Sequence, residues 1–194
     1  MPDRNPGHLP SNAAWLAGVL LTLCAAAAQA FDLQGHRGAR GLAPENSLSG
    51  FERALAVGVH TLELDVVITS DGVPVISHDT APNPDITRDG SGRWLQARGR
   101  PFYLSPLAEL AEFDIGRINP VSRYATEFPQ QQPVDGERIP TLAALFERVQ
   151  ALRADHVRFN IETKLHPLRS AESPEPQAFA RAVIEVVRAW GMAS

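Results

Sequence analysis

The sequence predicts an α/β fold in which parallel strands alternate with crossover helices. Short apolar runs with a two-residue period alternate along the chain with longer segments whose apolar residues recur every three or four positions. Alternation of this kind is typical of a parallel sheet with crossover connections. The Asp71-Gly72 turn, which joins two strands directly, departs from strict alternation.

Four strands and three long helices follow from these patterns. We expect strands at residues 33–35, 62–68, 73–77 and 157–164, and helices at residues 47–58, 141–152 and 176–190. Asn46 or Ser47 is expected to cap the first helix and Thr141 the second. Gly58 and Gly191 are expected to end the first and the last helix.

Residues 80–138 form the least regular stretch, rich in proline, glycine and scattered aspartates, with one short helix expected within 107–113. A loop this long inside a domain is usually functional or disordered. Four of its acids could be ligands, but solvated loop aspartates are far commoner. They are Asp85, Asp89, Asp114 and Asp135.

The N-terminus predicts a cleaved signal peptide over residues 1–30. An apolar run from Ala13 to Ala28 is too short to span a bilayer comfortably, and Ala28-Gln29-Ala30 supplies a small-x-small cleavage site. Cleavage would remove Cys24, the only cysteine, so the mature chain has no disulfide option. We therefore expect a periplasmic or secreted protein with no stable membrane insertion.

The composition narrows the choice of partners. The chain has a formal net charge of −4, no charged tail and no basic stripe. Nucleic-acid binding is therefore not expected.

Residues that carry chemistry cluster in the strand segments and just after them. They form five motifs: Gly35-His36-Arg37-Gly38, Pro44-Glu45-Asn46-Ser47, Glu63-Leu64-Asp65, His78-Asp79 and Asn160-Ile161-Glu162-Thr163-Lys164. Together these motifs could supply a general acid, a general base, ligands for a metal ion and positive charges that bind an anion. Phosphodiester hydrolysis needs all of these groups.

These five motifs, in this order from about Gly35 to Lys164, closely resemble the glycerophosphodiester phosphodiesterase family. The resemblance implies a (β/α)8 TIM-type barrel whose active site lies at the carboxyl ends of the strands. A barrel of this kind typically needs about 250 residues. Four strands in residues 31–194 therefore predict only the front half of a catalytic barrel, and residues 80–138 resemble the family's insertion, a cap over the substrate mouth.

His36 and His78 are the candidate general base and general acid, because an imidazole can play either part at neutral pH. We assign His36 as base and His78 as acid, and the reverse assignment stays open. Outside such a motif set, two satisfied structural histidines would be the simpler interpretation.

Glu63, Asp65 and Glu162 are the candidate metal ligands. Period-two geometry places Glu63 and Asp65 on one side of their strand, about 7 Å apart at the backbone. Three oxygen donors without cysteine or histidine indicate one divalent cation, Ca²⁺ or Mg²⁺, rather than zinc. The alternative is that the two acids on the first strand form the solvated face of a half-buried sheet.

Arg37 and Lys164 are the candidate phosphate-binding residues, the first as a fork and the second as a point charge. Lys164 is the only lysine in the chain, which favours a position that requires a compact charge. Glu45 and Asn46 are expected to support the site, with Glu45 orienting Arg37 or Asn46. His36 and Arg37 can both reach the site only if the first strand has ended by Gly35.

The function that these motifs imply is metal-dependent hydrolysis of small glycerophosphodiesters to glycerol 3-phosphate and an alcohol. A phospholipase of the same barrel type, similar to sphingomyelinase D, is one alternative. The other is a truncated product that keeps the motifs without catalysis. An open half barrel also predicts that the chain is a fragment lacking roughly 100 or more residues, since such a barrel needs about 250. Its sheet edge should favour self-association and low activity of the 194-residue chain.

Overall fold

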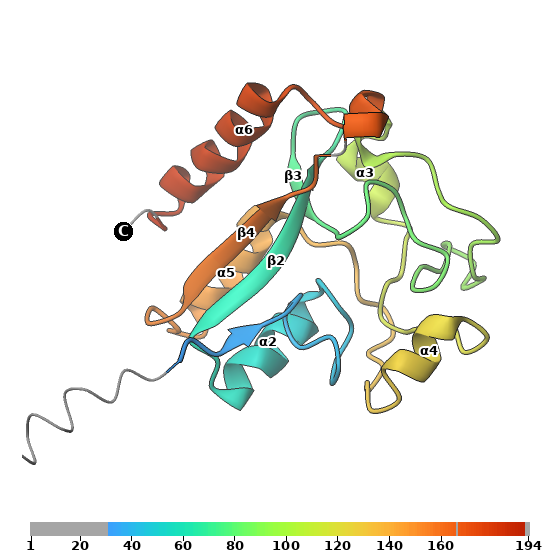
Figure 1. Cartoon of the computed structure of the whole chain (residues 1–194), viewed down its shortest axis with the longest axis horizontal. Coiled ribbons are helices and arrows are strands. Elements are labelled where there is room, and N and C mark those ends of the chain that lie inside the picture. The colour runs from blue at the N-terminus through green and yellow to red at the C-terminus, as the bar shows by residue number, and fades with distance from the viewer. Residues whose placement is uncertain (1–30, 166, 193–194) are drawn as a thin grey trace, which may run out of the picture. The chain divides into compact units, whose positions relative to one another are not determined.

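A computed structural model describes residues 31–165 and 167–192. The chain divides into a unit over Met1–Asp32 and a unit over Leu33–Ser194, and every helix and strand discussed below belongs to the second (Figure 1). The predicted signal peptide lies outside the described residues. Within those residues, no helix is both long and apolar enough to cross a membrane.

Strand β2 (Thr61–Ile68) is the centre of a four-stranded sheet. It pairs in parallel with β1 (Gln34–Gly35) and with β4 (Arg158–Thr163), and antiparallel with β3 (Pro74–Ile76). Because the first residues of β2 pair with β1 and β4 at once, these two strands lie on opposite edges of β2. By the same reasoning β3 shares the edge of β1.

The strand count is the one expected, but only three of the four strands are parallel. The tight Asp71-Gly72 turn, in which Gly72 has φ 82°, reverses the chain directly from β2 into β3. A connection this short can join only antiparallel neighbours, because a parallel pair needs a long crossover.

Three long helices have the expected places, with ends that differ by at most one residue. They are α2 (Leu48–Val57), α5 (Leu142–Ala151) and α6 (Pro176–Ala189). Ser47 caps α2 and Thr141 caps α5, each by accepting a hydrogen bond from a backbone N–H three residues later. Gly58, with φ 87°, ends α2 in the left-handed conformation that glycine adopts without steric cost.

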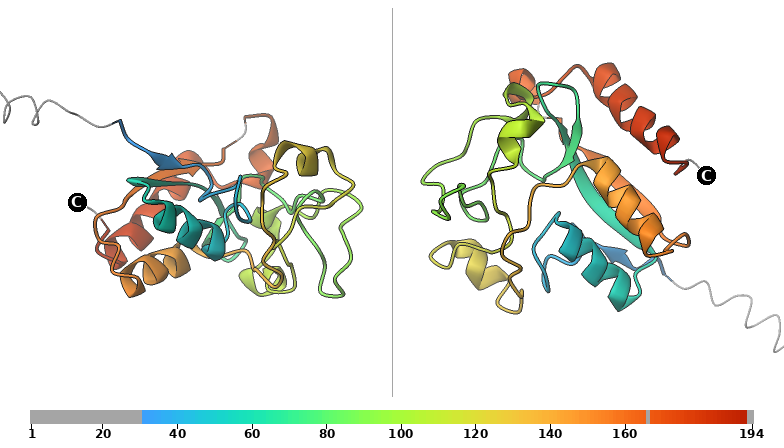
Figure 2. Two further views of the ribbon diagram at one scale, coloured as in Figure 1. Left: turned by 90° about the horizontal axis from the view of Figure 1, so that it is seen from below. Right: turned by 180° about the vertical axis from the view of Figure 1, so that it is seen from behind.

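The main core lies between these helices and one face of the sheet (Figure 2). Leu62, Leu64 and Val66 of β2 are fully buried against α2 and α5. Phe146 of α5 is also fully buried and meets Phe159 of β4 edge-on, with ring centroids 4.9 Å apart. Each such side chain contributes about 1.5–3 kcal/mol through burial.

Helix α6 contributes less to this core than the sequence predicts. Phe179 and Val183 are buried, whereas Val186 and Trp190, which the helical spacing also places on the apolar face, are only partly buried. Val186 lies in the last turn of α6 and Trp190 directly follows the helix, where its carbonyl accepts a hydrogen bond from Gln150 of α5.

The opposite face of the sheet carries the polar residues of β2 and β4. Glu63 and Asp65 project there from β2, and Asn160 and Glu162 from β4, of which the latter two are exposed. Among the described residues no helix covers this face (Figures 1 and 2). Parallel sheets are normally covered on both faces. The arrangement is that of a partial barrel with its interior face open.

Residues 80–138 are folded around a second, smaller core. They contain a 3₁₀ turn at Phe102–Leu104 and the short helices α3 (Leu107–Leu110) and α4 (Arg123–Glu127). Phe102, Leu110 and Ile115 bury their side chains against Val67 and Val75 of the β2–β3 hairpin. The helix expected within 107–113 thus ends at Leu110, and α4 is not predicted because none of its five residues is buried.

Ion pairs of Arg88 account for two of the four loop aspartates. Its Nη2 lies 2.6 Å from Asp114 Oδ2 and 2.5 Å from Asp135 Oδ1, and Arg117 makes a second pair with Asp135. These pairs connect three separated stretches of residues 80–138. Asp114 and Asp135 are therefore structural ion-pair partners.

Candidate active site

The loop after β1 carries the first two site residues. Because β1 ends at Gly35, His36 and Arg37 are free of strand alternation. Arg37 and Asn46 both have φ 51°, a left-handed conformation that costs a non-glycine residue on the order of 1–3 kcal/mol. Two hydrogen bonds hold the backbone of Arg37 in place. Its N–H donates to Glu63 Oε2 at 2.6 Å, and its C=O accepts from the Asn46 N–H at 3.0 Å.

Three carboxylates from two neighbouring strands converge on the open face of the sheet. Asp65 of β2 is paired in register with Glu162 of β4, and Glu63 lies two residues earlier on the same face of β2. One oxygen of each of the three lies within 4.8 Å of the other two. Asp65 is 1% exposed, whereas the Glu162 side chain is 58% exposed. The sequence prediction that these acids lie together agrees with this geometry.

This donor set suits a hard divalent cation. Ca²⁺ binds oxygen at about 2.3–2.6 Å, so two ligands on opposite sides of one ion lie about 5 Å apart. The separations among Glu63, Asp65 and Glu162 fall within that limit. These three side chains could hold one ion with little rearrangement, and the exposed side of Glu162 leaves room for water or substrate oxygens.

Lys164 lies immediately beyond β4 and contacts two of these acids. Its Nζ donates to Glu162 Oε1 at 2.8 Å and lies 3.3 Å from Asp65 Oδ1. Burial lowers the pKa of Lys164, but the hydrogen bond to Glu162 and the charges of both acids outweigh it, so the net pKa is raised. The ammonium is therefore a fixed positive charge beside the carboxylates.

Arg37 extends along the other side of Asp65. Its Nη1 donates to Glu45 Oε1 at 3.1 Å, and its Nε lies 3.5 Å from Asp65 Oδ2 but is buried without a hydrogen-bond acceptor. Burial lowers the pKa of Arg37, and the charges of Glu45 and Asp65 more than compensate, so it is raised. Glu45 thus contacts Arg37, one of the two partners expected for it.

Asn46 holds the carboxylate of Asp65 through a hydrogen bond. Its Nδ2 donates to Asp65 Oδ2 at 2.9 Å, and its Oδ1 is buried with no hydrogen-bond partner among the described residues. The amide fixes one oxygen of Asp65, which leaves Oδ1 of that carboxylate for Lys164 or a cation.

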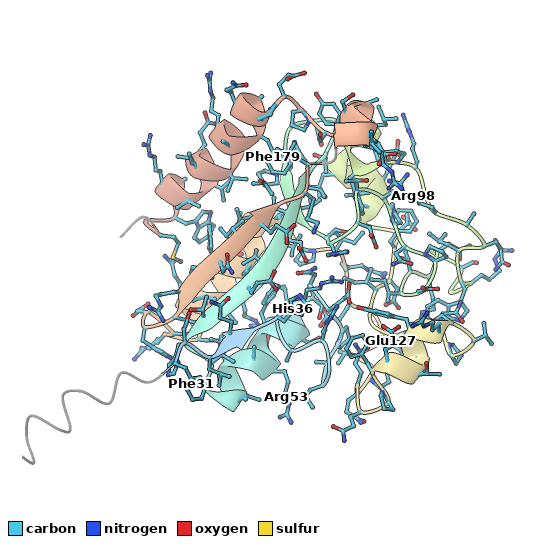
Figure 3. All side chains as sticks on the ribbon, in the orientation of Figure 1. Phe31, His36, Arg53, Arg98, Glu127 and Phe179 are labelled. Carbon is cyan, nitrogen blue, oxygen red and sulfur yellow. The ribbon has the colours of Figure 1, made fainter. Side chains whose placement is uncertain are left out.

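The two histidines belong to different segments, His36 to the loop after β1 and His78 to the loop after β3. His36 Nε2 is 3.9 Å from Glu63 Oε2, and its ring is 56% exposed. Figure 3 shows His36 between the sheet and the part of the molecule that carries Glu127 on α4. His78 follows β3 and lines a small cavity together with Glu45 and Asn46.

Asp79 holds the His78 ring, a contact to which sequence reasoning assigned no role. His78 Nδ1 lies 3.4 Å from Asp79 Oδ1, and Asp79 Oδ2 accepts a hydrogen bond from Asn83 Nδ2 at 2.8 Å. The interaction with His78 is the main cause that holds the pKa of Asp79 below its usual value. The His-Asp dipeptide was the available signal.

Tyr124 is the other residue that sequence reasoning missed. Its hydroxyl donates to Glu45 Oε2 from helix α4, 79 residues further along the chain. No motif surrounds Tyr124, and α4 has no apolar period. The sequence alone offers no signal for this contact.

A sheet with acids, bases and an anion clamp at strand ends is the arrangement of a barrel phosphodiesterase, and sequence comparison gives the family. Residues 36–194 match the Glycerophosphoryl diester phosphodiesterase family. The chain therefore belongs to that family, and the resemblance read from its five motifs is confirmed.

Individual relatives agree with this assignment. Glycerophosphodiester phosphodiesterase 1 of Rattus norvegicus is 39% identical over 109 residues, which are 55% of this chain and 27% of that protein. A crystal structure of a candidate glycerophosphoryl diester phosphodiesterase from Silicibacter pomeroyi superposes with a TM-score of 0.76 at 36% identity, over 82% of this chain and 54% of that one.

A second solved structure was determined with a reaction product. The Oleispira antarctica phosphodiesterase, in complex with the product sn-glycerol-3-phosphate, has a TM-score of 0.56 and 29% identity. The match covers 81% of this chain and 52% of that one. The chain thus spans about half the length of these two solved relatives, whose TIM-type barrel agrees with the predicted fold class.

Proposed function

We propose that this chain provides the strand-end site of a metal-dependent glycerophosphodiester phosphodiesterase, which releases glycerol 3-phosphate and an alcohol. The observation that carries the proposal is the meeting of three carboxylates, Glu63, Asp65 and Glu162, with the cations Arg37 and Lys164, in a chain of this family. The product complex of the Oleispira relative supports the substrate class.

Arg37 and Lys164 would bind the phosphate group. Arg37 lies beside Oδ2 of Asp65 and Lys164 beside Oδ1, so a phosphate placed beside this carboxylate would lie close to both positive charges. Their raised pKa values keep both side chains charged throughout the physiological range. Glu45 would orient the Arg37 guanidinium, and Asn46 would orient the Asp65 carboxylate.

The histidines would move the protons. His36, beside Glu63, would accept the proton of a substrate glycerol hydroxyl as it attacks phosphorus. His78 would give a proton to the leaving alcohol. Asp79, within 3.4 Å of its Nδ1, favours a proton on that nitrogen when the ring is neutral. The attack would close a cyclic phosphate on the glycerol as the alcohol leaves, and water would then open this ring with the roles of the two histidines reversed.

A divalent cation held by Glu63, Asp65 and Glu162 would stabilise the charge that develops on the phosphoryl oxygens. All-oxygen ligands favour Ca²⁺ or Mg²⁺. The two are separable by titrating each into protein freed of metal and following heat release, with Glu63→Gln as the control that should abolish binding.

The substrate assay separates this proposal from a phospholipase similar to sphingomyelinase D. Glycerophosphocholine and vesicles of intact choline phospholipid are each incubated with the protein and Ca²⁺ or Mg²⁺, and released products are followed by phosphorus-31 NMR. Cleavage of glycerophosphocholine alone supports the proposal. Cleavage of the vesicle lipid alone would replace it with the phospholipase.

A non-catalytic binding role is the second candidate, favoured by the open face that carries Asn160 and Glu162. It predicts that sn-glycerol 3-phosphate binds in a cation-dependent way while glycerophosphocholine stays uncleaved. The outer edge of β4, beside which no described strand lies, also offers backbone groups for pairing between copies. Light scattering of the chain over a range of concentrations would detect such self-association.

We further place this reaction outside the cytoplasm, on the sequence of residues 1–30. N-terminal sequencing of the protein recovered from an exporting host would start at Phe31 if the proposed cleavage occurs. In the same proposal residues 80–138 act as a cap beside the substrate.

A further inference from the structure

Residues 80–138 reach the proposed phosphate-binding residue Arg37 through the side chain of Tyr124, which contacts Glu45. Glu45 lies between Arg37 and Tyr124: Oε1 accepts from Arg37 Nη1 at 3.1 Å, and Oε2 accepts from the Tyr124 hydroxyl. The Glu45 side chain is only 5% exposed. Each carboxylate oxygen therefore has one donor, and a water cannot easily replace either of them.

The residues that follow Tyr124 contact Arg40, which lies in the loop after β1. The Phe128 ring packs edge-on against Tyr124 at 4.9 Å and lies under the Arg40 guanidinium at 4.8 Å. Gln131 Nε2 donates to the carbonyl of Arg40 at 2.7 Å. In Figures 1 and 2 helix α4 lies beside the loop that follows β1. Of these contacts, the packing against Phe128 holds the Tyr124 ring without using its hydroxyl.

Glu45 matters because Glu63 and Asn46 hold the backbone of Arg37, whereas its guanidinium is held by Glu45 and by the ion pair with Asp65. Its backbone is strained, and its Nε has no hydrogen-bond acceptor. Glu45 is the carboxylate to which Arg37 donates a side-chain hydrogen bond, and Tyr124 holds the second oxygen of that carboxylate. A rotation of Glu45 would therefore break this hydrogen bond and leave the guanidinium held by its ion pair with Asp65.

We propose that Tyr124 is a positioning residue, whose hydroxyl locks Glu45 and thereby fixes the Arg37 guanidinium for the phosphate of the substrate. The part that concerns phosphate rests on the function proposed above. The part that concerns Arg37 does not, and it can be tested without substrate.

The hydroxyl is suited to this task because it stays protonated. Burial, together with the neighbouring charge of Glu45, raises the pKa of Tyr124 far above its ordinary value. Tyr124 therefore stays protonated and donates to the carboxylate at neutral pH. No change in its charge is needed for its role.

The test measures hydrogen exchange of the Arg37 Nε–H by nitrogen-15 NMR, with the resonance assigned by its loss in Arg37→Lys. Tyr124→Phe keeps the ring and its contact with Phe128 and removes only the hydroxyl. Because Glu45 then has an unsatisfied buried oxygen, we expect exchange to accelerate about tenfold. Backbone amides of β2 in the same sample serve as the reference for global opening.

Tyr103→Phe is the matched control, the same change in the other tyrosine of the chain, and it should leave Arg37 exchange unchanged. Glu45→Gln should accelerate exchange to a similar extent. Combining Tyr124→Phe with Glu45→Gln should have no further effect, because both changes break the same chain of hydrogen bonds from Tyr124 through Glu45 to Arg37. Wild-type exchange in Tyr124→Phe, or fully additive effects of the two changes, would overturn the proposal.

Turnover of glycerophosphocholine supplies the second readout. If Arg37 binds the phosphate equally well in the ground state and in the transition state, its loss of position should affect KM and not kcat. We therefore expect Tyr124→Phe to raise KM about five- to tenfold with kcat little changed. A fall in kcat at constant KM would exclude action through Arg37. Accelerated exchange without any turnover in the wild type would support the positioning role and refute the proposed function instead.

Discussion

Replacing Asp65 by asparagine tests whether the buried carboxylate is the electrostatic centre of the site. The Asp65 side chain is 1% exposed, with Arg37 Nε at 3.5 Å and Lys164 Nζ at 3.3 Å. At an effective dielectric constant of about 20, each attraction is worth about 5 kcal/mol. Repulsion by Glu63 and Glu162, whose oxygens lie within 4.8 Å, cancels on the order of 3.5 kcal/mol each.

The net contribution of the Asp65 charge is therefore about 2–3 kcal/mol, toward the upper end of this range because solvent around the exposed side of Glu162 screens its repulsion. Asp65→Asn should lower the free energy of unfolding by that amount without added cation. Urea denaturation would show it as a shift of the midpoint by about 1 M. In the wild type, Ca²⁺ at about 100 times its Kd should add about 2.7 kcal/mol, and Asp65→Asn should lose most of this gain.

Glu162→Gln is the matched control, because it makes the same chemical change in the same cluster at a 58% exposed side chain. Its stability without cation should change by less than about 1 kcal/mol, while the stabilisation by Ca²⁺ should still fall. The reasoning is refuted if Asp65→Asn is as stable as Glu162→Gln and keeps the full stabilisation by Ca²⁺.

Three further predictions follow from individual contacts. His36→Ala and His78→Ala should each lower kcat for glycerophosphocholine by about 10²–10⁴-fold, and an unchanged kcat in either would remove that histidine from the reaction. Phe146→Ala should cost about 3–5 kcal/mol in urea denaturation, because the ring is fully buried against Phe159; a loss below about 1 kcal/mol would contradict this packing. The pKa of Tyr124 is raised on folding, so its stabilising effect is complete below about pH 10 and is lost as the pH rises further. Tyr124→Phe should therefore lose less stability than the wild type between about pH 9 and about pH 11, and equal losses would argue against the raised pKa of the Tyr124 phenol.

Periodic elements could be predicted because their own residues determine them. The alternation from Leu62 to Ile68 marks β2 and places Glu63 and Asp65 on one face, and Thr141 marks the start of α5. The antiparallel direction of β3 was also implicit in its short Asp71-Gly72 turn. These features depend on interactions between residues close in sequence.

Contacts that depend on long-range packing could not be predicted. Tyr124 reaches Glu45 across 79 residues, and α4 is held by its contacts with the loop after β1 rather than by a helical pattern. The partial exposure of Val186 and Trp190 likewise depends on which elements lie beside α6. Sequence periodicity carries no information on those neighbours.

The most direct test of the account is phosphorus-31 NMR of glycerophosphocholine mixed with a near-equimolar amount of the protein, so that even slow turnover is visible. We predict conversion to sn-glycerol 3-phosphate with Ca²⁺ or Mg²⁺, and no conversion after chelation or in His36→Ala. Equal conversion in the presence of a chelator would contradict the metal site formed by Glu63, Asp65 and Glu162. An absence of conversion under every condition would contradict the diesterase function of this chain.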